Sequence, residues 1–87
     1  MPHTPTVLVT VTGKDTPGIT AGLVQVVARE GATLLDVEQV VVQGQLTLCL
    51  LLVTSSDAPV LKELLFTASQ RGLAMTFAEL QPAPRPS

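Results

Sequence analysis

The sequence is poor in aromatic residues: it contains two phenylalanines and neither tyrosine nor tryptophan among its 87 residues. RNA-recognition domains stack bases on aromatic side chains of their central strands, and this chain offers no such platform. It is also poor in positive charge, with five lysines and arginines against seven acidic residues and a net charge of −2. Because nucleic acids are bound through basic surfaces, the composition predicts no nucleic-acid partner.

Cysteine and histidine occur once each, as Cys49 and His3. A single cysteine excludes an internal disulfide, and it excludes a soft-metal site that is ligated by two cysteines close together. His3 lies near the start of the chain, so we expect no Ser–His–Asp constellation. Lys14, the only cation near the first turn, lacks the bidentate fork with which an arginine clamps a phosphate. We therefore expect no metal, no cofactor and no enzymatic activity, and we interpret Cys49 as an apolar filler.

Long apolar runs are absent too, since no stretch approaches the roughly 18 residues that a membrane span needs. The first residues have neither the cationic start nor the apolar stretch of a signal peptide. We expect no membrane partner and a cytoplasmic location. The hydrophobic fraction of 46% is ample for one domain with a core of valine, leucine, isoleucine and alanine.

Hydrophobic periodicity predicts six elements in the order βαββαβ. Alternating valines predict the first strand, and apolar residues at helical spacing predict a helix directly after it. The remaining pattern predicts two strands, a second helix and a final strand. The four strands are expected over residues 6–13, 32–43, 46–53 and 73–80.

Turn and capping residues indicate where these elements begin and end. We expect Thr16 to cap the first helix, with Pro17 at its first position and Gly18 inside its first turn. Gly31 is expected to end that helix.

Residues of the same kinds indicate a bulge, a hairpin turn and the ends of the second helix. A slip in the alternation near Leu34 predicts a bulge, and Gly44 predicts a tight hairpin turn. Ser56 or Asp57 is expected to cap the second helix, with Pro59 in its first turn, and Gly72 is expected to end it.

Together the elements predict a ferredoxin-like α+β fold, in which two helices cover one face of a four-stranded antiparallel sheet. The expected strand order is 4-1-3-2, which leaves the second and fourth strands at the edges. We expect an N-terminal tail over residues 1–5, the domain over 6–81 and a proline-rich tail or linker over 82–87.

The corner between the first strand and the first helix, TGKDTPGITAGL, is the candidate binding site. Free amides at a helix start favour a carboxylate, and Gly18 lets a ligand approach the backbone without meeting a Cβ. Asp15 adds a negative charge beside them, so the corner is complementary to a zwitterionic amino acid. The alternative interpretation is structural: Asp15 and Thr16 serve as caps and Gly18 fits the packing.

The second strand is the candidate interface. Asp36 and Glu38 protect only the first half of this long edge. A twofold copy pairing antiparallel with it would create one eight-stranded sheet and a homodimer. A helix-to-helix dimer is the second option. The interface residues are expected to be Val37, Gln39, Val40, Val41 and Val42.

Two stretches of the sequence, VTVTGKDTPGITAGL and GATLLDVEQVVVQGQLTLCLLLV, resemble an ACT domain. The resemblance covers about residues 7–80, and the Gly-x-Asp-x-Pro-Gly run begins at Gly13. The pattern is most similar to the N-terminal ACT segment of bacterial phosphoserine phosphatases, and also to stand-alone ACT proteins and glycine cleavage repressors. The phosphatases continue into a catalytic domain with an Asp-x-Asp-x-Thr motif, which this sequence lacks. The chain is therefore either a fragment or a free-standing relative.

The resemblance implies a regulatory domain that binds a small amino acid, such as serine or glycine, between two domains. Asp15 would then bind the ammonium group, and the backbone from Thr16 through Pro17 and Gly18 to Ile19 would hold the carboxylate. The alternative is a ligand-free assembly module of a larger protein such as a phosphoserine phosphatase.

Overall fold

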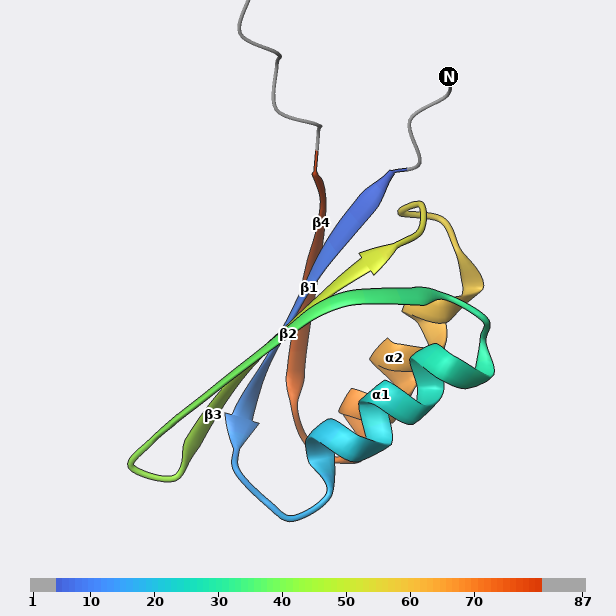
Figure 1. Cartoon of the computed structure of the whole chain (residues 1–87). Helices are drawn as coiled ribbons and strands as arrows, with labels where there is room; N and C mark the ends of the chain where they lie inside the picture. Colours follow the sequence, from blue (N-terminus) through green and yellow to red (C-terminus); the bar gives the residue numbers. More distant parts are fainter. Residues whose placement is uncertain (1–4, 81–87) are drawn as a thin grey trace, which may run out of the picture.

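The computed structural model describes residues 5–80, which form one sheet with two helices on one of its faces (Figure 1). The expected βαββαβ order is confirmed, and so is the strand order, β2-β3-β1-β4. All neighbouring strands are antiparallel. The elements are β1 (Thr6–Lys14), α1 (Ile19–Arg29), β2 (Thr33–Val42), β3 (Gln45–Val53), α2 (Pro59–Gln70) and β4 (Ala74–Leu80).

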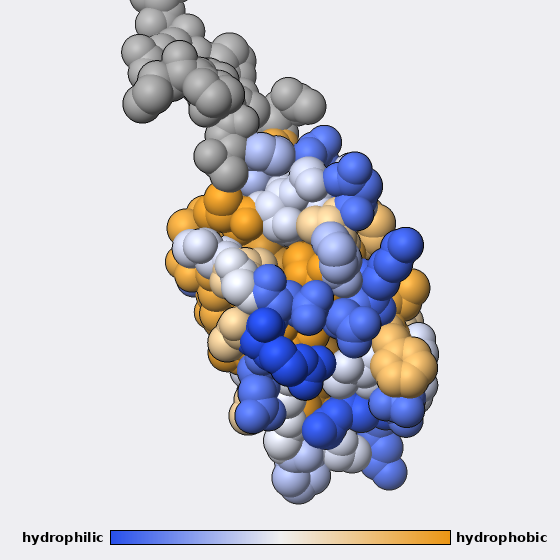
Figure 2. Space-filling view, turned by 90° about the vertical axis from the view of Figure 1, so that its right-hand side faces the viewer, coloured by the Kyte–Doolittle hydropathy of each residue, from blue (hydrophilic) through white to orange (hydrophobic). Residues whose placement is uncertain are grey.

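The core lies between the sheet and the helices, and it is made of aliphatic side chains. Because side chains alternate along a strand, β1 and β3 each send every second residue into it. The fully buried strand residues are Val7, Val9, Val11, Leu46, Leu48, Leu50 and Leu52. From the other side of the molecule, α1 and α2 contribute Leu23 and Leu64, which are also fully buried. Figure 2 shows the helix-bearing side, where hydrophilic residues cover much of the outer surface.

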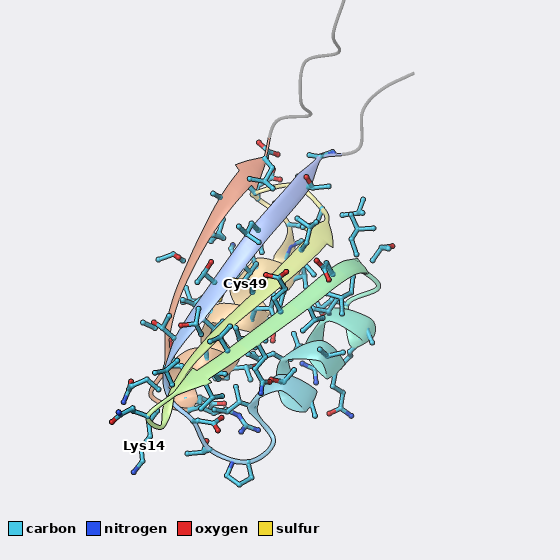
Figure 3. All side chains as sticks on the ribbon, turned by 60° about the vertical axis from the view of Figure 1, so that its left-hand side comes forward. Lys14 and Cys49 are labelled. Carbon is cyan, nitrogen blue, oxygen red and sulfur yellow. The ribbon has the colours of Figure 1, made fainter. Side chains whose placement is uncertain are left out.

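The opposite face of the sheet is open, and Figure 3 looks onto it. Cys49 lies near the middle of this face on the central strand β3 (Figure 3), and its side chain is half-buried. The expectation of a small, buried or half-buried apolar filler agrees with this position. Asp36 and Glu38 are exposed on β2, as expected for a solvated edge.

The hairpin between β2 and β3 has the expected tight turn. Gln43 and Gly44 have φ values of 51° and 78°, and two consecutive residues with positive φ are characteristic of a type I′ turn. The expected bulge is also present, because the register of β2 against β3 shifts between Leu34 and Asp36. Leu35 is thus the extra residue, and β2 runs regularly only after it.

The predicted helix caps were wrong at both N-termini. Helix α1 is capped by Gly18 with no side-chain hydrogen bond, so Thr16 and Pro17 lie in the loop before it. Gly18 has a φ of 85°, a left-handed conformation that a Cβ would strain, so the chain enters the helix through a glycine and not through a hydroxyl cap. Gly18 is therefore the N-cap and does not lie inside the first turn.

Helix α2 is capped by Ala58, with Pro59 at its start as expected. The Ser55 hydroxyl donates to the Asp57 carboxylate at 2.6 Å, so these side chains close the preceding turn and do not cap the helix. This hydrogen bond, together with a backbone hydrogen bond, lowers the pKa of Asp57. Both helix ends were predicted correctly, since Gly31 and Gly72 directly follow the C-caps Glu30 and Arg71.

Two predictions fall partly outside the described residues. The N-terminal tail with His3 and the proline-rich segment over 82–87 are in the undescribed ranges 1–4 and 81–87. Within residues 5–80, neither helix is long and apolar enough to cross a membrane.

Burial on one face of β3 generates a stability prediction. Leu50 is fully buried and Leu51, on the opposite face, is half-buried. Leu50→Ala should lower the free energy of unfolding by about 2–5 kcal/mol, because it leaves a cavity in the core. Leu51→Ala is the matched control and should cost clearly less. Urea unfolding of both variants measures the difference, and equal losses would contradict this packing.

Candidate functional site

The candidate corner lies where β1 ends, beside the hairpin of β2 and β3. The Asp15 backbone N–H donates to the Gly44 carbonyl at 2.8 Å, which ties the corner to the hairpin turn. Figure 3 shows Lys14 at this end of the sheet, with its side chain directed away from the body of the domain. The conformation of the corner therefore depends on a loop that is nearly thirty residues away in the sequence.

A hollow of about 360 Å³ opens at this corner. It brings together all five residues that the sequence suggested for binding: Asp15, Thr16, Pro17, Gly18 and Ile19. Three further residues line it, namely Thr20, Ala21 and Gln39. Thr20 and Ala21 continue the first helical turn, whereas Gln39 comes from the edge strand β2.

The start of α1 presents backbone donors to this hollow. The first hydrogen bond of the helix runs from the Gly22 N–H to the Gly18 carbonyl, at 2.9 Å. The amides of Ile19, Thr20 and Ala21 precede it and so have no acceptor within the helix. Together with the positive end of the helix dipole, these groups favour a carboxylate or another anion.

Gly18 is favoured at this position by its backbone conformation. A Cβ built on it would meet no atom within 4 Å, so the local space would accept a side chain. Its φ of 85° is what favours glycine, because an L-residue is strained in this conformation. The conformation of Gly18 therefore fixes how the chain enters the helix whose first residues line the hollow.

Gln39 connects the hollow to the sheet edge. Its side-chain oxygen accepts a hydrogen bond from the Thr20 hydroxyl of α1. The sequence suggested Gln39 only as an interface residue, and the structure places it at the hollow as well. One signal was available: Gln39 alternates with Val37 and Val41, so it is the polar member of an otherwise apolar row.

The charge at the site comes from one side chain. Among the described residues that line the hollow, Asp15 is the only ionisable one, and it is exposed. Residues 5–80 contain no cluster of three or more His, Cys, Asp or Glu side chains suited to a metal ion. A carboxylate beside free amides is complementary to a group that carries an ammonium and a carboxylate.

The other candidate surface is the outer edge of β2. This strand pairs only with β3 and is at the end of the sheet. Its valines are well exposed: Val37 by 36%, Val40 by 56%, Val41 by 43% and Val42 by 63%. Such an apolar, unpaired edge favours association with another strand.

Comparison with known proteins agrees with this architecture. The ACT domain profile matches residues 5–78. A phosphoserine phosphatase of Mycobacterium tuberculosis is 56% identical over 48 residues, which cover 55% of this chain and 12% of that protein. A phosphoserine phosphatase of Streptomyces coelicolor is 51% identical over 47 residues, covering 54% of this chain and 12% of the relative. The matched segment thus represents about one eighth of these enzymes.

Solved structures share the fold at lower identity. A proposed glycine cleavage system transcriptional repressor superposes with a TM-score of 0.80 and 22% identity, over 95% of this chain and 50% of that one. An ACT domain protein from Streptococcus pneumoniae superposes with a TM-score of 0.71 and 23% identity, over 88% of this chain and 91% of that one. At these identities the likeness concerns the fold alone.

The left-handed N-cap generates a paired prediction for two glycines of the same segment. Gly18→Ala should lower the free energy of unfolding by about 1–2 kcal/mol, because alanine is strained at this φ. Gly22→Ala is the matched control in the interior of α1, where alanine is favoured by about 0.5–1 kcal/mol. Its Cβ would meet only the end of the Arg71 side chain, at 3.0 Å, which is free to move aside. Thermal unfolding compares them, and a Gly18→Ala protein as stable as the wild type would refute the assignment.

Proposed function

This chain belongs to the ACT domain family, and we propose that it is a regulatory domain that binds a small amino acid, such as serine or glycine, at a dimer interface. The observation that carries the proposal is the hollow at the start of α1, where Asp15 lies beside free helix amides. In this proposal the domain regulates and does not catalyse.

The two ends of an amino acid fit the two kinds of group at the corner. The Asp15 carboxylate would bind the ammonium group through a charge-assisted hydrogen bond. The backbone between Thr16 and Ile19, extended by the amides of Thr20 and Ala21, would bind the carboxylate. A volume of about 360 Å³ leaves room for a small side chain and some water.

Serine is the preferred candidate because of the relatives. Two enzymes that share this segment are named phosphoserine phosphatases, and removal of phosphate from phosphoserine yields serine. A domain that senses serine would allow such a protein to respond to its own product. We propose a cytoplasmic location on the same ground, since this is where a free amino acid pool would be sensed.

The dimer is proposed to form through β2. Two copies related by a twofold axis would pair their β2 edges antiparallel and extend the sheet to eight strands. Pairing would cover exposed valines of β2, which favours association. It would also bring the two corner hollows toward each other, because Gln39 belongs to both the hollow and the edge.

A second candidate function is an assembly module without ligand. The observation in its favour is coverage: the matched segment represents 12% of each phosphatase, so in those proteins it accompanies a much larger remainder. In this case the edge of β2 would be the functional surface and the corner would be a structural turn.

Ligand binding is tested by thermal unfolding with serine, glycine and a panel of other amino acids. Serine at about 100 times its dissociation constant should add about 2.7 kcal/mol to the free energy of unfolding. Asp15→Asn should abolish this gain, because the ammonium group loses its counter-charge. Asp57→Asn, a matched change at an exposed site outside the hollow, should retain it. A melting curve that no amino acid shifts would contradict the sensor and favour the assembly module.

The dimer is tested by proline substitution in β2. Adjacent backbone N–H groups of a strand point to opposite edges, so either Val40 or Val41 donates outward. Of Val40→Pro and Val41→Pro, one should therefore give a monomer of near-native stability, and the other should lose a hydrogen bond to β3. Sedimentation velocity and urea unfolding separate the two effects, with Val41→Thr as a control that keeps the donor. A monomeric wild type at high micromolar concentration, or two proline variants that stay dimeric, would rule out this edge.

A further inference from the structure

We propose that the C-terminal segment of this chain, residues 81–87, docks on the open face of the sheet and places Arg85 between the carboxylates of Asp36 and Glu38. The starting observation is a second hollow, of about 170 Å³, on the face that Figure 3 views. It is separate from the hollow at the start of α1, and the proposed amino-acid site does not use it. All four strands contribute to its lining, which consists of Leu8, Asp36, Glu38, Cys49, Leu51 and Leu80.

The floor of this hollow is apolar, although it lies on a face that the helices leave uncovered. Strand β3 is apolar on both sides, because Leu50 is buried beneath the helices while Cys49 and Leu51 face away from them. Leu51 is directly opposite Leu8 of β1, and both are half-buried. Leu80, at the end of β4, is 39% exposed. Covering such side chains with another apolar group is favourable, so the floor favours an occupant.

The rim of the hollow carries negative charge. Asp36 and Glu38 are on this face of β2, since they pair with Leu51 and Cys49 of β3. One carboxylate oxygen of Asp36 accepts a hydrogen bond from the Val37 backbone N–H at 2.9 Å, and the second oxygen remains available to a cation. Among the described residues that line the hollow, none is positively charged. The hollow therefore fits an occupant that combines apolar groups with one cation.

The positions of the other cations leave Arg85 for this role. Arg29 and Lys62 belong to α1 and α2, which cover the opposite face of the sheet, and Arg71 directly follows α2. Lys14 is at the far end of β1, six residues from the position of that strand that lines the hollow. At the rise of a strand this separation is about 20 Å. The chain contains five lysines and arginines, and Arg85 is the fifth.

The segment is long enough to bring Arg85 to these carboxylates. Leu80 itself lines the hollow, so the segment starts at the rim. Strands β4 and β2 are three strand spacings apart, and Asp36 is in the row of Ala78, two residues before Leu80. With strands about 4.8 Å apart and a rise of about 3.3 Å per residue, Leu80 and Asp36 are separated by about 16 Å. Five residues in a polyproline conformation, at about 3.1 Å each, span about the same distance, and the arginine side chain extends this reach.

The composition of the segment lowers the cost of docking. Residues 81–87 have the sequence QPAPRPS, with a proline at every second position from 82 to 86. Proline has a fixed φ and also restricts the residue before it to extended conformations. A chain restricted in this way loses less conformational entropy when it binds. The prolines and Ala83 supply apolar groups for the floor, and Arg85 supplies the cation for the rim.

Cys49 is a native reporter of the cover, because it lines the hollow and is the only cysteine of the chain. Its alkylation by iodoacetamide, a neutral reagent, is followed by mass spectrometry of the intact protein at low salt. Arg85→Gln should raise the rate by about threefold or more, since the reactivity of a thiol follows its exposure. Arg85→Lys keeps the charge and should retain most of the protection. Arg29→Gln, the matched control on α1, should react as the wild type does, and an unchanged rate in Arg85→Gln would overturn the proposal.

Cross-linking locates the segment directly. In the Arg85→Lys protein, a carbodiimide should join the amine at position 85 to the carboxylate of Asp36 or Glu38 through an amide bond, and peptide mass spectrometry identifies the link. An equal mixture of ¹⁵N-labelled and unlabelled protein shows whether the link lies within one chain. A link at neither carboxylate would refute the docking. Links only between two chains, or protection of Cys49 that rises with protein concentration, would assign this face to a second copy and would also refute it.

Discussion

The structure depends on the alternation of side chains along the two central strands. With two phenylalanines in the whole chain, and both well exposed, the core has only aliphatic groups with which to fill its volume. The valines of β1 and the leucines of β3 form adjacent rows on one face, and the apolar stripes of both helices pack against these rows. Burial of such side chains contributes about 1.5–3 kcal/mol each, so the placement of the helices follows from these rows. The position of the corner site follows from this packing as well, because the corner connects the end of β1 to the start of α1.

The corner also depends on two residues with positive φ that lie far apart in the sequence. Gly18 starts α1 beside the hollow, and Gly44 closes the hairpin and accepts the hydrogen bond of the Asp15 amide with its carbonyl. The candidate site is therefore built from backbone geometry more than from side-chain chemistry. This agrees with the residues that line the hollow, because Asp15 supplies the only charged side chain among them and most of the others are small residues.

Strand β2 serves two surfaces at once. Its outer edge carries exposed valines, and its helix-facing row carries Gln39 into the hollow. A ligand at the corner and a partner at the edge would therefore contact the same strand, which gives a short physical path between binding and association.

Much of this protein was determined by local sequence. The period-two pattern of β1, the apolar run of β3, the helical stripes and the glycines after both helices predicted the element order, because these features depend on neighbours along the chain. The sheet order followed from the fold class that this element order favours. The run from Asp15 to Ile19 was likewise recognisable as a corner. Tertiary structure decided the rest. The predicted N-cap of α1 was Thr16, and the structure has Gly18 there, since the loop must reverse direction while the hairpin holds the Asp15 amide. Gln39 joined the site because the packing of α1 against the sheet brings it beside Thr20, nineteen residues earlier, and no local pattern encodes that contact.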